Sequence, residues 1–117
     1  MNAQEIMGYE PPPEGAAWIK VMVEIERPPA AELEQLSRRA RYRRLKDNAR
    51  QHRTDLEAWV HREGLDDEVQ TIAEATAFNL LFAVATPKAA EAMADAPGVV
   101  AVMTGDVPIE PMHTAYA

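Results

Sequence analysis

The sequence predicts an α+β domain in which a four-stranded antiparallel sheet and two helices form a two-layer sandwich. Three observations lead to this prediction. Every second side chain of residues 18–25 is aliphatic, which is the period of a strand. Residues 30–63 repeat apolar side chains at steps of mostly three and four, which is the period of a helix. The segments follow one another as strand, helix, strand, strand, helix, strand, and a chain of 117 residues suits one domain.

The first strand, "WIKVMVEI" (18–25), has one aliphatic and one mixed face. The aliphatic face holds Ile19, Val21, Val23 and Ile25, and the mixed face holds Trp18, Lys20, Met22 and Glu24. Pro28 and Pro29 end the strand, because proline cannot donate to a sheet ladder. The preceding residues, 1–16, contain three consecutive prolines, and we expect them to form a disordered lead-in.

The helical segment, 30–63, is long for so small a domain. Gly64 follows it at the position of a C-terminal cap. A single helix of this length would span roughly 50 Å at about 1.5 Å per residue, which is more than a small sheet covers. We therefore expect either a break near Ser37 or a basic part that projects from the sheet.

Two short runs, 68–75 and 78–86, follow closely enough to form a hairpin. Thr86 and Pro87 are typical of the first residues of a helix. The pair Pro97-Gly98 stops that helix.

The last strand is expected at 99–103 and is closed by Gly105. The domain then spans 17–106 and leaves an extended tail at 107–117. The order of elements favours a ferredoxin-like βαββαβ arrangement with both helices on one face of the sheet.

One face of such a sheet is left open, and its residues are candidates for contact with a partner. The run 78–86 is apolar on both of its faces, and Trp18 and Met22 lie opposite the aliphatic face of the first strand. One alternative is that the lead-in folds over this face or that a central strand is simply apolar throughout. Another is a homodimer joined through the open faces.

Composition disfavours an enzyme, a metal protein and a membrane protein. The chain has no cysteine, no glycine-rich phosphate loop and no nucleophile motif. His52 and His61 are nine residues apart, which is not a metal-binding spacing, so no cofactor or metal is expected. No apolar run is long enough to span a membrane and no signal peptide is visible, which favours a cytoplasmic protein.

Part of the sequence resembles a known family. The stretch "FNLLFAVATPKAAEAMADAPGVVAV" is similar to the second half of the propeptide-like inhibitors of subtilisin-type serine proteases, the inhibitor I9 family. "RARYRRLKDNARQHRTDLEAWVHREGL" is similar to the first helix in the prodomains of some bacterial subtilases. The resemblance implies a protein that inhibits a subtilisin-type protease and acts as its intramolecular chaperone. An excised prodomain of this kind would be secreted rather than cytoplasmic.

The resemblance also implies which residues touch the protease. The tail would lie in the substrate cleft like a cleaved product, with either Tyr116 or Ala117 in the first pocket. The cleft-binding residues would be Met112, His113, Thr114, Ala115, Tyr116 and Ala117. The sheet-face contacts would be Trp18, Met22, Glu74, Asn79 and Leu81, with Glu74 as an anion at the helix N-termini of the enzyme.

The basic segment supports an alternative. Residues 38–53 carry eight basic side chains and one acid, in a chain of net charge -7. This helix is a candidate to bind nucleic acid or an acidic protein. Nucleic acid is disfavoured, because base-stacking sheets of this class need exposed aromatic side chains within a basic surface.

Overall fold

The structure is a computed structural model, which describes residues 17–75 and 79–108 of the 117. Its elements, in chain order, are β1 (Ile19–Ile25), α2 (Ala30–Glu34), α3 (Arg38–Arg62), a 3₁₀ turn (Asp66–Glu68), β2 (Val69–Glu74), β3 (Leu80–Ala85), α4 (Pro87–Met93) and β4 (Val99–Pro108). The order predicted from the sequence is confirmed, with the predicted long helix divided into α2 and α3.

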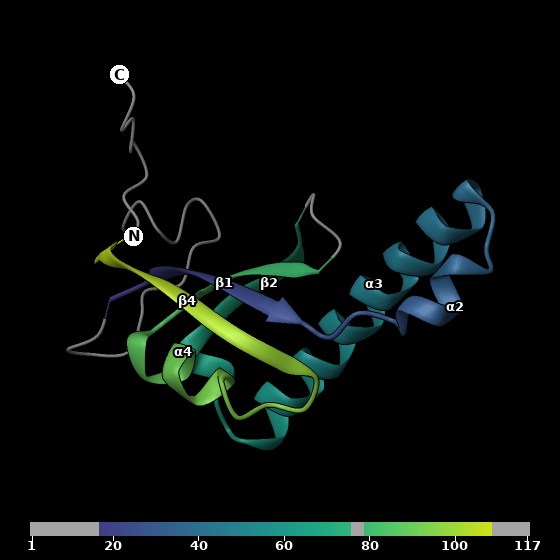
Figure 1. Ribbon diagram of the computed structural model, residues 1–117. Helices are drawn as coiled ribbons and strands as arrows, with labels where there is room; N and C mark the ends of the chain where they lie inside the picture. Colours follow the sequence, from purple (N-terminus) through teal and green to yellow (C-terminus); the bar gives the residue numbers. More distant parts are fainter. Residues whose placement is uncertain (1–16, 76–78, 109–117) are drawn as a thin grey trace, which may run out of the picture.

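The four strands form one antiparallel sheet in the order β2-β3-β1-β4 (Figure 1). β1 and β3 lie in the middle, and β2 and β4 form the two edges. Both α4 and the C-terminal half of α3 lie below the sheet in Figure 1. The α+β fold with a four-stranded antiparallel sheet is therefore as the sequence predicts.

The core lies between this lower face and the two helices. The aliphatic face of β1 is buried, and α3 contributes Ala49, Leu56, Trp59 and Val60. α4 contributes small side chains, Ala89 and Ala90, together with Met93. Small residues let a helix approach a sheet closely, and the core face of β3, which α3 covers, carries the equally small Ala83 and Ala85.

The long helical segment both breaks and projects. Ser37 separates α2 from α3 and caps α3, because its Oγ accepts a hydrogen bond from the backbone N–H of Ala40 at 3.2 Å. None of residues 30–48 is buried, and Figure 1 shows α2 and the first part of α3 extending away from the sheet. We call residues 30–48 the basic arm.

The last strand is longer than the sequence predicts. β4 passes Gly105 and ends at Pro108, which lies opposite Ile19 of β1. The β1–β4 register has an irregularity in this added part, between Ile19 and Val21, and a second one at the other end of the pair, between Glu24 and Ile25. Residues 107 and 108, predicted as the start of the tail, thus belong to the sheet, and the remainder of the tail lies outside the described residues.

Candidate protein-interaction face

An apolar row crosses the open face of the sheet, the side away from α4. Met22 of β1 lies opposite Phe82 of β3 and opposite Met103 of β4, and Phe82 lies opposite Ala73 of β2. Directly opposed residues of an antiparallel pair point to the same side and have Cβ atoms about 5 Å apart. Ala73, Phe82, Met22 and Met103 therefore form one continuous row, which we call the apolar row.

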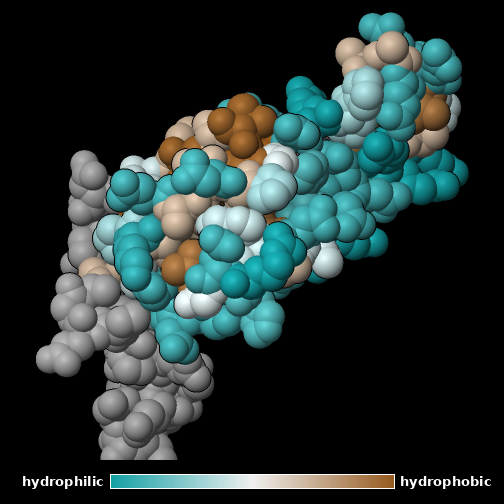
Figure 2. Space-filling view, turned by 90° about the horizontal axis from the view of Figure 1, so that it is seen from below, coloured by the Kyte–Doolittle hydropathy of each residue, from teal (hydrophilic) through white to brown (hydrophobic). Residues whose placement is uncertain are grey.

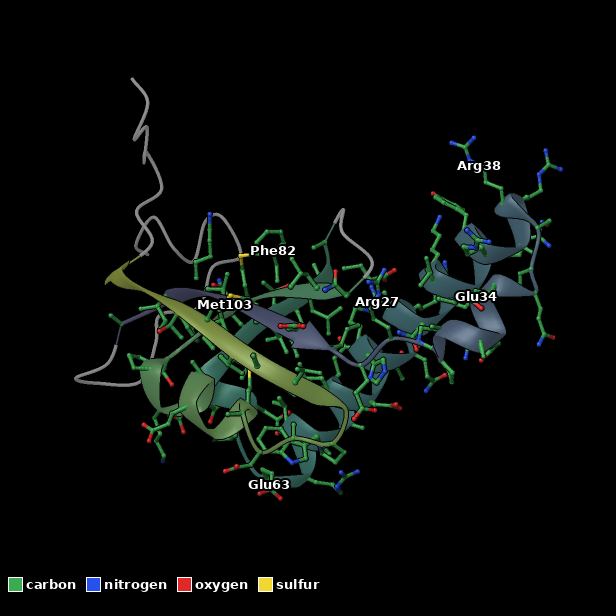
Figure 3. All side chains as sticks on the ribbon, in the orientation of Figure 1. Arg27, Glu34, Arg38, Glu63, Phe82 and Met103 are labelled. Atoms are coloured by element: carbon green, nitrogen blue, oxygen red, sulfur yellow. The ribbon has the colours of Figure 1, made fainter. Side chains whose placement is uncertain are left out.

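The apolar row is accessible from solvent. Phe82 is 38% exposed and Met103 is 47% exposed, and Met22 between them is half-buried. Figure 3 shows Phe82 and Met103 on the side of the sheet that faces away from α4. Large apolar side chains that adjoin one another on a surface are typical of a binding site, and methionine adapts its shape to varied partners.

Charged side chains flank the row on β1. Lys20 lies opposite Val84 of β3, and Glu24 lies opposite Leu80 of β3. Within the part of the chain that the structure describes, neither Lys20 nor Glu24 takes part in an ion pair. The open face is thus an apolar strip with one cation and one anion on opposite sides of its centre.

The structure places the predicted sheet-face residues in different surroundings. Met22 lies in the centre of the open face. Trp18 immediately precedes β1 and is only 8% exposed, yet it is not part of the core cluster between sheet and helices. Asn79 is half-buried in the turn just before β3, and its backbone carbonyl accepts a hydrogen bond from the N–H of Ile25 at 2.9 Å.

Two of those residues do not lie on the open face. Leu81 is fully buried, at 0% exposure, because it points to the same side as Val23, its partner in the register. Glu74 takes part in an ion pair with Arg53 of α3, whose Nη1 lies 3.0 Å from Glu74 Oε2. Leu81 therefore belongs to the core and Glu74 to the contact between β2 and α3.

Phe82 and Met103 were not among the predicted contacts. Because both faces of the 78–86 run are apolar, periodicity separated the faces without saying which one the helices cover. Side-chain size was the missing signal: the small Ala83 and Ala85 suit close packing beneath a helix, here α3, whereas Phe82 does not.

The basic arm is the second notable surface. Arg39, Arg43 and Lys46 follow one another at steps of four and three, so they share one side of α3, and Arg50 continues this side just beyond the arm. On another side of the arm, Arg44 pairs with Glu32 of α2 at 2.7 Å, and Arg41 donates to the carbonyl of Leu33 at 3.1 Å. Figure 2 shows the arm at the upper right, hydrophilic over most of its surface. The sequence-based suggestion that this helix binds nucleic acid or an acidic protein stays a prediction.

The cap at Ser37 offers a local test of the arm. The first turn of α3 has no acid and begins with Arg38 and Arg39, which the helix dipole disfavours. We expect Ser37→Ala to destabilise the start of α3 by about 1 kcal/mol, which accelerates hydrogen exchange of the second-turn amides roughly fivefold. Ser37→Asp, which keeps a capping oxygen, should exchange like the parent. Equal rates in the parent and the alanine variant would contradict the role of this cap.

A hollow lies between α3 and the turn before β4. Its volume is about 390 Å³, and it is lined by Glu26, His52, Asp55, Ala58, Arg62, Pro97 and Gly98. The lining offers charged groups but no hydroxyl or thiol to act as a nucleophile. Among the described residues, no group of histidine and acidic side chains is arranged to hold a metal ion, and no helix is long and apolar enough to cross a membrane.

The predicted cleft-binding residues, Met112, His113, Thr114, Ala115, Tyr116 and Ala117, lie outside the described residues.

Comparison with known families assigns the chain to a different family from the one that its sequence resembled. The model of the PopD family matches residues 19–104, which run from the start of β1 into β4. No curated protein and no solved structure matches the chain.

The predicted membership of the inhibitor I9 family was wrong, since the matching family is PopD. The quoted pattern of strand, Thr-Pro, alanine-rich helix and Pro-Gly-Val is explained by local structure. Thr86 caps α4 by accepting from the N–H of Ala89 at 3.2 Å, Pro87 opens the helix, and Gly98 has a φ of 81°. Inhibition of a subtilisin-type protease and assistance in its folding rested on that membership and are withdrawn with it.

Proposed function

This chain belongs to the PopD family, and we propose that it is a protein-binding module without enzymatic activity, which engages a protein partner through the open face of its sheet. The observation that carries the proposal is the apolar row, which reaches from one edge strand to the other with Phe82 and Met103 exposed.

The chemistry of the open face supports binding of protein rather than of a small polar molecule. A shallow sheet face cannot enclose a ligand, but it can pack against another apolar surface of similar size. The flanking charges on β1 would then form a polar border that fixes the orientation of the partner.

Photo-crosslinking tests the proposal in the cell that makes the protein. A benzoylphenylalanine in place of Phe82 should give a discrete covalent adduct with a protein, because the ring at this position lies inside the proposed interface. The same amino acid in place of Glu91, which is exposed on α4, should give none. The adducts are separated by electrophoresis and identified by mass spectrometry.

A substitution within the face provides the specificity control. With the crosslinker at Met103, Phe82→Asp should reduce the adduct at least about tenfold, because a carboxylate would be desolvated in the apolar row. Circular dichroism should show an unchanged fold, since Phe82 is outside the core cluster. Equal adduct yields from positions 82 and 91, or no adduct from the open face, would show that the face is not a binding site.

A further inference from the structure

The charges of the open face are arranged so that the face is complementary to itself. Lys20 and Glu24 lie on the same side of β1, two residues before and two residues after Met22. We infer that the partner of the open face is a second copy of this chain, packed face to face with the two β1 strands antiparallel, so that Lys20 of each copy pairs with Glu24 of the other. This inference rests on the proposed function and names its partner.

Strand geometry brings the two charges together. At about 3.3 Å per residue, Lys20 and Glu24 each lie roughly 6.6 Å from Met22 along the strand. A two-fold axis between the sheets, crossing β1 at right angles at Met22, places Lys20 of one copy over Glu24 of the other. Sheets stack about 10 Å apart, a gap that a lysine and a glutamate side chain bridge between them.

The same two-fold axis also brings the apolar residues of one copy opposite those of the other. The apolar row runs across the strands and therefore lies along the axis, so Phe82, Met22 and Met103 would each face their own equivalents. Sheets in contact are usually rotated by about 30°, which displaces residues about 5–7 Å from Met22 by only about 3 Å.

The charges select this arrangement over its main competitor. A two-fold axis along β1 would give a parallel pair of strands, with Lys20 over Lys20 and Glu24 over Glu24. Like charges opposed in an interface disfavour association. Two copies joined through their edge strands would not bring Lys20 and Glu24 together, because both residues lie on β1, which is a central strand.

The size of the face indicates a weak dimer. Four strands about 4.8 Å apart and about 20 Å long present on the order of 400 Å² per copy. Two copies would bury about 800 Å², which is below the range of about 1,200–2,000 Å² for stable complexes. We therefore expect a reversible dimer with a dissociation constant in the micromolar range.

Charge reversal on the full-length chain tests the arrangement by sedimentation velocity over micromolar to millimolar concentrations. Lys20→Glu gives an open face with two acids, and Glu24→Lys gives one with two bases, so each variant alone should dimerise at least about tenfold more weakly. Mixing the two variants should restore dimers, because the acidic face complements the basic one. The double variant Lys20→Glu/Glu24→Lys should also dimerise like the parent, since both pairs are formed with reversed polarity.

Matched controls separate the interface from net charge. Lys46→Glu and Glu63→Lys change the net charge equally at exposed positions of α3 and its C-cap, away from the sheet, and should dimerise like the parent. A parent chain that dimerises but does not respond to reversal of Lys20 or Glu24 would overturn the inference, because its interface would lie elsewhere, for example at an edge strand.

A monomeric parent would overturn the inference too, and the crosslinker at position 82 then identifies the true occupant. An adduct with another protein leaves the proposed function standing and rejects the second copy. A crosslink within one chain, to residues 1–16, rejects both, because the face would be covered by its own N-terminal segment. Where the parent does dimerise, an adduct that contains only two copies of this chain supports the inference.

Discussion

Leu81→Ala should lower the free energy of unfolding by about 3 kcal/mol, within the range of about 2–5 kcal/mol found for buried leucines. Leu81 is fully buried at 0% exposure on β3, between β1 and β2. Its loss removes apolar contacts and leaves a cavity that a strand paired on both sides cannot collapse to fill. Urea unfolding followed by tryptophan fluorescence measures the change, with an unaltered m-value if the fold is kept.

The neighbouring residue is the matched control. Leu80 has the same side chain but points to the open face, where it is half-buried opposite Glu24. Leu80→Ala should therefore cost only about 1 kcal/mol. Equal costs would contradict this difference between the two faces, and a larger cost for Leu80→Ala would mean that the core and open faces have to be exchanged.

Pattern alone predicts most of the fold because the decisive signals are local. Alternation identifies β1, and the Thr86-Pro87 pair marks where α4 begins. These signals act over a few residues and depend on no distant partner. The length of the helical segment predicted either a break near Ser37 or a basic part that projects from the sheet, and the structure has both (Figure 1).

The predictions that failed depend on tertiary contacts. The core face of β3 is decided by the helix that packs against it, and Ala83 and Ala85 fit the close approach of α3 where Phe82 does not. β4 continues past Gly105 because β1 offers it a partner as far as Ile19. A glycine in the sequence predicts the end of a strand, but the backbone hydrogen bonds to a distant strand outweigh its low strand propensity.

The family assignment failed for a related reason. Thr-Pro before a helix and Pro-Gly after it meet the needs of caps, so they recur wherever a short helix joins two strands. The apolar row carries more information about this chain, because it joins residues of four strands that are distant in sequence. No local pattern could have brought Ala73, Phe82, Met22 and Met103 together.

Gly98→Ala should lower the free energy of unfolding by about 2–3 kcal/mol. Gly98 has a φ of 81°, a left-handed conformation that costs a non-glycine residue about 1–2 kcal/mol. A Cβ added there would lie 2.6 Å from Cε1 of the His52 ring. The ring of His52, which belongs to α3, would therefore have to rotate out of its contact with residue 98. Gly98 also positions the residue that follows β1, because its backbone carbonyl accepts a hydrogen bond from the N–H of Glu26 at 2.9 Å.

Gly64 separates the two causes. It has a φ of 70°, but no atom lies within 4 Å of an added Cβ, so Gly64→Ala should cost only the backbone strain, about 1 kcal/mol. Adding His52→Ala to Gly98→Ala should recover the steric part and leave the strain, and a double-mutant cycle of thermal or urea unfolding measures that coupling. If Gly98→Ala and Gly64→Ala cost the same, the His52 ring yields freely and the hollow beside it has room to receive it. A larger cost at Gly98 means instead that the His52 ring is held in place, so that the turn into β4, and with it the strand that carries Met103, is fixed by a contact with α3.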